Sequence, residues 1–126
     1  MPMSVLIADD AAFMRRLLRD ILTEAGYIVH EAVSGEDAVE KYTEVRPDLV
    51  TMDLGMPGLS GLEALEHIRS RDQKARVVVV SAAGSEEMIS EALRLGAAAY
   101  VRKPFQPATV LDAVRKALLV PPASRC

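Results

Sequence analysis

The sequence predicts an α/β fold, a (βα)5 doubly wound sandwich, and three observations lead to this prediction. Short apolar runs of strand length alternate with segments whose apolar residues recur at helical spacing. The alternation repeats through a chain of 126 residues, which is the size of one domain. Several of the strand runs are almost entirely apolar, as are strands buried on both faces. Together these features indicate a parallel sheet with helices on both sides.

Five apolar runs are expected to be the strands of this sheet. They lie at residues 5–8, 28–33, 49–52, 77–80 and 99–102. The first, third and fourth runs are the most uniformly apolar, so we expect them at the centre. His30 and Glu31 interrupt the second run, and the fifth also carries polar positions, so both suit the edges. The strand order that follows is 2-1-3-4-5, with its switch point between the first and third strands.

Helical spacing and capping residues mark the first two helices. One apolar stripe runs through residues 13–25, and Gly26 is expected to follow this helix as its C′ residue. Ser34 with Asp37 resembles a capping box at the start of the second helix. Pro47 marks the end of this strand and helix unit. The inward positions expected in these helices are Phe13, Met14, Leu17, Leu18, Ile21, Leu22, Ala25, Ala38, Val39 and Tyr42.

The remaining three helices carry comparable signals. Ser60 and Glu63 form a capping box, and Ser85 is expected to cap the fourth helix. Gly96 ends the fourth helix, and Pro107 fits the first position of the fifth. The inward positions expected here are Leu62, Leu65, Ile68, Met88, Ile89, Ala92, Leu93, Val110, Leu111, Val114 and Leu118.

Bulk composition narrows the classes of function. The formal net charge of -3 favours neither nucleic acid nor an anionic membrane as a partner. Tryptophan is absent and aromatic residues make up 4% of the chain, so a base-stacking surface is not expected. The single cysteine, Cys126, has no partner within the chain, which fits a reducing cytoplasm. No run is long enough to span a bilayer, and we expect no membrane insertion.

Five polar side chains follow four of the expected strands directly. They are Asp9 and Asp10, Asp53, Ser81, and Lys103. Because parallel strands end at one edge of a sheet, these side chains are expected to meet in the crevice where such sheets bind ligands. Three crowded carboxylates repel one another unless a cation joins them. Mg²⁺ is the natural occupant, since it prefers carboxylates together with water and phosphate oxygens.

Each of these residues also has an ordinary explanation when it is taken alone. Asp10 could cap the first helix, and Ser81 could bond to the backbone at a strand end. Lys103 could be a solvated surface lysine. Pro104 follows it, however, and a cis bond before proline would aim the lysine side chain in a fixed direction. It is the combination of these residues that favours a phosphate and metal site.

The segments that carry these residues resemble the receiver domain of two-component response regulators. The resemblance covers about residues 5–119 and is most like stand-alone chemotaxis regulators of the CheY type, with a flavodoxin-like fold. Flavodoxin and these regulators are known examples of the strand order 2-1-3-4-5, so the present pattern is consistent with that order rather than an independent derivation of it. The segments are Asp9-Asp10, Asp53-Leu54-Gly55-Met56-Pro57 with Gly61, Ser81-Ala82, and Lys103-Pro104-Phe105.

The resemblance implies a metal-dependent phosphoacceptor site. Asp53 would accept a phosphoryl group from a phosphohistidine of a sensor histidine kinase. Asp9 and Asp10 would hold Mg²⁺, directly or through water, together with Asp53 and the backbone carbonyl of Gly55. Mn²⁺ could substitute for Mg²⁺. Lys103 would bind the phosphoryl group.

The resemblance also implies a switch and a set of partners. Ser81 would be the hydroxyl drawn toward the phosphoryl group, and Tyr100 the aromatic residue whose rotamer follows it. The chain would not be an enzyme in the ordinary sense, although it takes part in its own phosphorylation and dephosphorylation. A downstream output protein, such as the flagellar motor switch, and a phosphatase would be further partners. Residues 1–120 would be the receiver domain, and residues 121–126 a disordered tail or the start of a linker.

Other interpretations share parts of this pattern. A flavodoxin-type electron carrier would need a phosphate loop where this chain has Asp9 and Asp10, which would repel phosphate. A small phosphatase with an aspartyl nucleophile would place two acids two residues apart after the first strand, whereas here they are adjacent. A degenerate receiver would lack part of the set of acids, hydroxyl and lysine. A phosphorelay intermediate and a receiver cut from a longer regulator remain alternatives.

Overall fold

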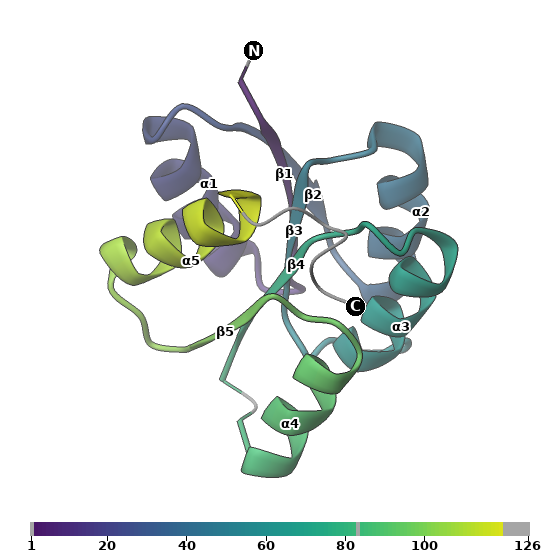
Figure 1. The fold of residues 1–126 in the computed structure, drawn as a ribbon. Coiled ribbons are helices and arrows are strands. Elements are labelled where there is room, and N and C mark those ends of the chain that lie inside the picture. Colours follow the sequence, from purple (N-terminus) through teal and green to yellow (C-terminus); the bar gives the residue numbers. More distant parts are fainter. Residues whose placement is uncertain (1, 83, 120–126) are drawn as a thin grey trace.

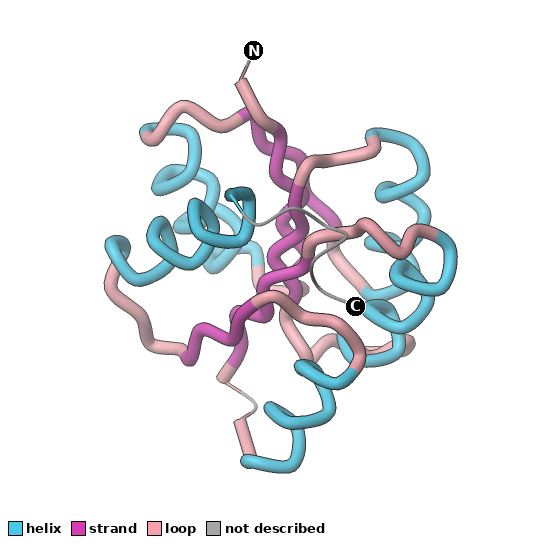
Figure 2. The backbone as a smooth tube through the Cα atoms, in the orientation of Figure 1, coloured by secondary structure: helices cyan, strands magenta, loops and turns pink. Residues whose placement is uncertain are grey.

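The computed structural model describes residues 2–82 and 84–119, which form one parallel sheet between two layers of helices (Figures 1 and 2). The strand order is β2-β1-β3-β4-β5, as predicted, with β2 and β5 at the edges. The strands are β1 (Ser4–Ala8), β2 (Ile28–Ala32), β3 (Leu49–Met52), β4 (Val77–Ser81) and β5 (Ala99–Arg102). The helices are α1 (Ala12–Glu24), α2 (Gly35–Val45), α3 (Gly61–Arg71), α4 (Glu86–Arg94) and α5 (Pro107–Leu119). The expected tail 121–126 lies outside the described residues.

Alternate residues of the central strands point into two separate cores. In Figure 1, α1 and α5 lie on one side of the sheet, and α2, α3 and α4 lie on the other. Val5 and Ile7 of β1 are buried with α1 and α5, whereas Leu6 and Ala8 are buried against the opposite layer. This is the two-residue period of a strand, and burial of each large aliphatic side chain contributes about 1.5–3 kcal/mol. The two cores hold the carboxyl ends of β1, β3 and β4 at one edge.

The expected end signals of the helices are largely confirmed. Ser60 and Glu63 form both hydrogen bonds of a capping box, each at 3.2 Å. Ser34 caps α2 by accepting a hydrogen bond from the Asp37 amide at 3.0 Å. The Asp37 carboxylate bonds to the Val33 amide instead of the Ser34 amide, so the predicted box is half formed.

Gly26 and Gly96 follow α1 and α4 with φ values of 99° and 105°. Residues with a side chain rarely adopt these left-handed backbone angles, whereas glycine has no Cβ atom and adopts them without a steric penalty. Both residues therefore end their helices where the sequence predicts.

Two details of the sequence prediction were wrong, and one alternative explanation is excluded. Strand β2 runs through His30 and Glu31 without interruption and ends at Ala32, because an edge strand tolerates polar side chains. Asp10 does not cap α1, whose N-cap residue is Ala11. Some expected inward positions are solvent-exposed, because the buried stripes of α1 and α4 are narrower than their apolar stripes. These exposed residues are Phe13, Leu17, Ala25 and Leu93.

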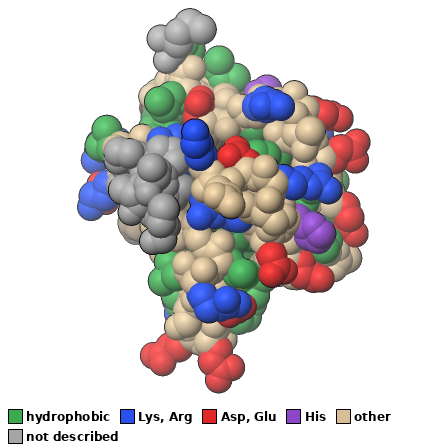
Figure 3. Space-filling view, turned by 45° about the vertical axis from the view of Figure 1, so that its right-hand side comes forward, with side chains coloured by type: hydrophobic (Ala, Val, Ile, Leu, Met, Phe, Trp, Pro, Cys, Tyr) green, Lys and Arg blue, Asp and Glu red, His purple; other side chains and the backbone are tan. Residues whose placement is uncertain are grey.

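Figure 3 shows one face of the molecule with its side chains coloured by type. That face carries acidic and basic side chains close to one another, with acidic ones gathered along its right side and lower end. Within residues 2–82 and 84–119, no helix is long and apolar enough to cross a membrane.

Tyr42 ties the end of α2 to the end of α3. Its hydroxyl donates a hydrogen bond of 2.8 Å to the Asp72 carboxylate. Burial, followed by this hydrogen bond, raises the pKa of Tyr42 well above its ordinary value. We expect Tyr42→Phe to lower the free energy of unfolding by about 1 kcal/mol at neutral pH. Urea denaturation measures this, with Tyr27→Phe as the control that removes the same hydroxyl elsewhere.

The same pKa shift sets the pH dependence of this contribution. A tyrosine whose pKa is raised in the folded state stabilises the protein fully below the unfolded-chain value of about 10. The contribution declines at higher pH, because the unfolded chain ionises first. The difference between the wild type and Tyr42→Phe should therefore be constant from pH 7 to about 9 and shrink above about 10. A difference that grows with pH would contradict this assignment.

Candidate functional site

Three carboxylates meet at the carboxyl edge of the sheet. Asp9 and Asp10 follow β1, and Asp53 follows β3, whose last residue pairs in register with the last residue of β1. The Asp53 amide continues this ladder by donating to the Ala8 carbonyl at 3.0 Å. One ligand atom from each of the three carboxylates lies within 4.8 Å of the others. Asp9 and Asp53 are buried, whereas Asp10 is exposed.

Lys103 brings a positive charge into this group. Its Nζ atom lies 2.7 Å from Oδ2 of Asp9 and 3.6 Å from Oδ2 of Asp53. The lysine side chain is only 13% exposed. Its amide donates to the Ser81 carbonyl at 3.1 Å, which aligns the segment after β5 with the end of β4. The bond between Lys103 and Pro104 is cis.

Ser81 and Gly55 hold one oxygen of Asp53. The buried Ser81 hydroxyl donates to Oδ1 of Asp53 at 2.7 Å and accepts from the Leu54 amide at 3.3 Å. The Gly55 amide donates to the same Oδ1 atom at 3.2 Å. Asp53 therefore has one oxygen bound by a hydroxyl and an amide, and the other facing the ammonium of Lys103.

Tyr100 lies beside this group on β5. It is partly buried, and its hydroxyl is hydrogen-bonded to the Ser81 side chain. Burial raises the pKa of Tyr100, against smaller opposing effects of the Arg102 charge and the Ser81 hydrogen bond. Arg102 itself donates to the Gly84 carbonyl at 2.9 Å, which ties the end of β5 to the segment that leads into α4. The Ser81 hydroxyl, which binds Asp53, is thus also in contact with Tyr100 on the edge strand β5.

The donor set suits a hard divalent cation. Three carboxylates face one ammonium, so the group carries excess negative charge at neutral pH. All of the available ligand atoms are oxygens, which Mg²⁺ prefers over nitrogen or sulfur. Asp10 is exposed and can exchange water for a cation without opening the core. The arrangement can therefore bind Mg²⁺ next to Asp53.

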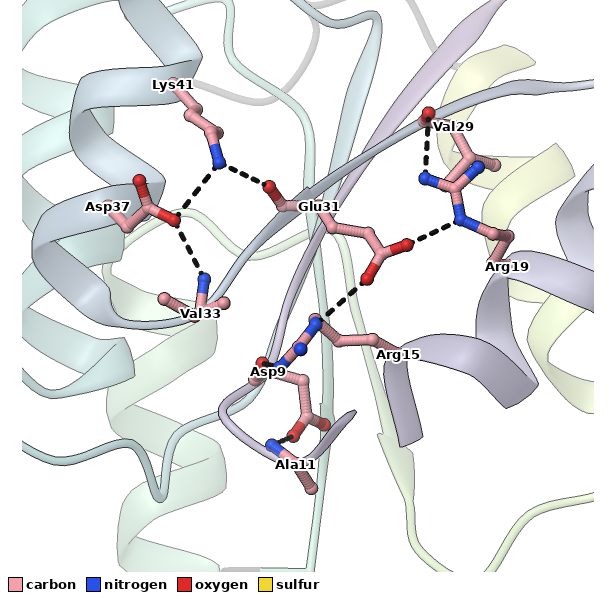
Figure 4. A network of polar contacts seen from close by, with 9 residues as sticks. All are labelled: Asp9, Ala11, Arg15, Arg19, Val29, Glu31, Val33, Asp37 and Lys41. Carbon is pink, nitrogen blue, oxygen red and sulfur yellow. Dashed lines mark hydrogen bonds and ion pairs between the residues drawn. The ribbon is translucent and has the colours of Figure 1, made fainter. Parts of the chain in front are cut away.

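The structure adds residues that the sequence interpretation missed. Arg15 of α1 donates to the Asp9 carbonyl at 2.9 Å and is itself bound by Glu31 of β2, as Figure 4 shows. Arg102 was expected only as a strand residue, but it contacts Gly84. The available sequence signal for Arg15 was its spacing: Arg15 and Arg19 share one face of α1, four residues apart.

Comparisons with known proteins agree with this geometry. Residues 5–115 match the response regulator receiver domain. The chain is 50% identical over 113 residues to the chemotaxis protein CheY of Thermotoga maritima, covering 89% of this chain and 94% of that protein. It is 48% identical over 115 residues to CheY of Bacillus subtilis, covering 90% of this chain and 96% of that protein.

A solved structure shows the same fold. It is a complex of CheX and CheY with BeF3 and Mg from Borrelia burgdorferi, and it matches with a TM-score of 0.91 and 36% identity. The match covers 95% of this chain and 92% of that one.

Proposed function

Because this chain belongs to the response regulator receiver domain family, in its CheY-type branch of two-component and chemotaxis signalling, we propose that Asp53 is its phosphoacceptor. The observation that carries this proposal is the convergence of Asp9, Asp10, Asp53 and Lys103 at one edge of the sheet. The phosphoryl donor would be a phosphohistidine of a sensor histidine kinase. The bond from histidine nitrogen to phosphorus breaks, and a bond from an Asp53 carboxylate oxygen to phosphorus forms.

The proposed metal site uses the oxygens around Asp53. Asp10, Asp53 and the backbone carbonyl of Gly55 would hold Mg²⁺, with Asp9 contributing directly or through water. When bound, Mg²⁺ supplies neutralisation of the charge that develops on the transferred group. Mn²⁺ has the same preference for oxygen ligands and could substitute for it.

Lys103 and Ser81 have proposed roles after phosphoryl transfer. Both already contact Asp53, through Nζ at 3.6 Å and Oγ at 2.7 Å. A phosphoryl group offers three strong acceptor oxygens, so the ammonium and the hydroxyl would move onto it. Movement of Ser81 removes its present bond to Tyr100, and the aromatic ring can then take another rotamer. This couples the acceptor to the surface of α4, β5 and α5.

That surface is the proposed output face. A downstream protein would bind it when Asp53 is phosphorylated, and the flagellar motor switch is the candidate that the CheY-type relatives favour. A phosphatase would be a further partner.

Phosphoryl uptake from a small donor tests the proposal. The wild-type chain is incubated with acetyl phosphate, with Mg²⁺ or with EDTA, and the intact mass is measured. We expect one added phosphoryl group in Mg²⁺ and none in EDTA. Absence of uptake in Mg²⁺ would contradict the proposed function.

The lifetime of the aspartyl phosphate is expected to depend on Gly55. A side chain at this position would have room, since a Cβ there would meet only Oδ1 of Asp53, at an ordinary 3.8 Å. With glycine, water reaches the phosphoryl group but no side chain holds it, so self-dephosphorylation should be slow to moderate. Gly55→Asn adds an amide that can position this water, and we expect the lifetime to fall on the order of tenfold.

Loss of the phosphoryl mass with time after removal of the donor measures this lifetime. Asp20→Asn adds an amide on the exposed surface of α1 and serves as the control. Identical lifetimes in the wild type and Gly55→Asn would show that the side chain at this position has no effect.

A further inference from the structure

Asp9 is held at each of its polar backbone and side-chain atoms. Its amide donates to the Ala32 carbonyl at 3.1 Å. Its two carboxylate oxygens are bound by the Ala11 amide at 2.9 Å and by Lys103 at 2.7 Å. Its carbonyl accepts a hydrogen bond of 2.9 Å from Arg15 of α1. The last of these contacts joins a side chain of α1 to the Asp9 backbone, and the function proposed above assigns it no role.

The Asp9 carbonyl matters because it belongs to the peptide that leads into Asp10. A peptide unit is planar, so the direction of this carbonyl sets the plane in which the Asp10 amide lies. Asp10 is exposed and lies in the turn between β1 and α1, where no strand ladder orients it. The bond from Arg15 to the Asp9 carbonyl therefore orients the backbone from which the Asp10 carboxylate projects.

Glu31 of β2 determines where the Arg15 guanidinium lies. Oε1 of Glu31 accepts from Nε of Arg15 at 2.9 Å, while the NH1 group of the same guanidinium reaches Asp9. The donors of a guanidinium form a rigid planar fork, so anchoring one of them directs the others. The Arg15 side chain is only 16% exposed, which limits its alternative positions. Figure 4 shows Glu31 between α1 and Lys41 of α2.

Glu31 is in turn held from both neighbouring helices. Its Oε2 atom accepts from Nε of Arg19, and its backbone carbonyl accepts from Lys41 at 3.0 Å. The hydrogen bond from Arg19 is the largest cause that lowers the pKa of Glu31, and Arg15 adds to it. Glu31 thus stays ionised at neutral pH and keeps its two arginine partners.

We infer that Arg15 is a positioning residue for the metal site: anchored by Glu31, it orients the peptide between Asp9 and Asp10 so that Asp10 can bind Mg²⁺. This inference rests on the proposed function only for the identity of the cation. Replacing a residue that orients a metal ligand without itself binding the metal commonly weakens metal affinity by about 10–100-fold. The effect here is transmitted through one backbone carbonyl, so we expect the lower end of that range.

Arg15→Lys is the sharpest test because it keeps the positive charge and removes the planar guanidinium with its several hydrogen-bond donors. A lysine has a single nitrogen and cannot hold Glu31 and the Asp9 carbonyl in the same fixed geometry. Arg16→Lys makes the same change at the next position, where the side chain is exposed, and is the matched control. Dissociation constants for Mg²⁺ are measured by competition with Mn²⁺, followed by electron paramagnetic resonance, without any phosphoryl donor.

We expect Arg15→Lys to weaken Mg²⁺ binding about tenfold and Arg16→Lys to change it less than about twofold. Glu31→Gln should weaken binding by a smaller factor. The double variant Arg15→Lys with Glu31→Gln should bind Mg²⁺ no more weakly than Arg15→Lys alone, because both changes act through one contact. The amide resonance of Asp10 should shift in metal-free Arg15→Lys and not in Arg16→Lys.

Urea denaturation separates this role from a purely structural one. A variant that loses stability but binds Mg²⁺ as tightly as Arg16→Lys would show that the network merely clamps β2, and it would overturn the inference. Additive effects in the double variant would also overturn it. A wild-type chain that binds no Mg²⁺ would contradict the proposed metal site, and this inference with it. Normal Mg²⁺ binding without phosphoryl uptake would contradict the proposed acceptor alone.

Discussion

Replacing Asp53 with asparagine is expected to abolish the gain of one phosphoryl group from acetyl phosphate in Mg²⁺. The amide keeps the size of the side chain and can still accept hydrogen bonds from Ser81 and Gly55, which now bind Oδ1. It lacks the negative oxygen that attacks phosphorus, and it removes one charge from the metal site. The effect should therefore be complete loss rather than a modest decrease.

Intact mass spectrometry measures this result, and two variants make it specific. Asp20→Asn, on the exposed surface of α1, makes the same chemical change away from the site and should leave uptake unchanged. Asp10→Asn should take up the phosphoryl group more slowly, since it removes a metal ligand but not the acceptor. A phosphoryl group that remains in Asp53→Asn would have to be located by peptide mapping, and its presence would refute Asp53 as the acceptor.

Replacing Lys103 with methionine is expected to have opposite effects on stability and on Mg²⁺ binding, and also to slow phosphoryl uptake. Without metal, the free energy of unfolding should fall by about 3 kcal/mol, because the nearly buried Asp9 carboxylate loses its partner at 2.7 Å. Binding of Mg²⁺ should become about tenfold tighter, because a competing positive charge has left the group of acids. Phosphoryl uptake should be slower, since the ammonium no longer neutralises the transferred group.

Urea denaturation in EDTA and in Mg²⁺ measures the effects on stability and on Mg²⁺ binding. Mg²⁺ should stabilise Lys103→Met more than the wild type, because a ligand that binds the folded state more tightly adds more stability. Lys116→Met is the control: Lys116 also pairs with an aspartate, Asp112, at 3.0 Å, but its side chain is 73% exposed. An exposed pair of this kind is screened by water and contributes much less to stability than a buried pair. Equal losses in the two variants would contradict the importance of the buried pair.

Both predictions use residues that could be selected from the sequence. Asp53 and Lys103 follow expected strands directly, and parallel strands bring their ends to one edge whatever the details of packing. The same holds for Asp9, Asp10 and Ser81. Central strands could be told from edge strands because uniformly apolar runs need cover on both faces, whereas the run containing His30 and Glu31 does not.

Local signals were less reliable where tertiary contacts decide the outcome. Helical spacing placed Phe13 and Leu17 on the inward stripe of α1, but the width of a buried stripe depends on how a helix lies against the sheet. Asp37 had the spacing of a capping box, yet its carboxylate binds the Val33 amide and Lys41 instead. Such choices depend on which donors come near in space, and spacing along the chain does not contain that information.

By itself the sequence determined the class of fold, which strands lie at the centre and which at the edges, and the acids, hydroxyl and lysine at their ends. These follow from the periods of apolar residues and from the polarity of each strand, which act over short stretches of chain. Only the tertiary structure decided that Lys103 lies closer to Asp9 than to Asp53, and that Glu31 holds Arg15 against the Asp9 carbonyl. These contacts join residues from different elements, and their geometry exists only after the helices have packed on the sheet.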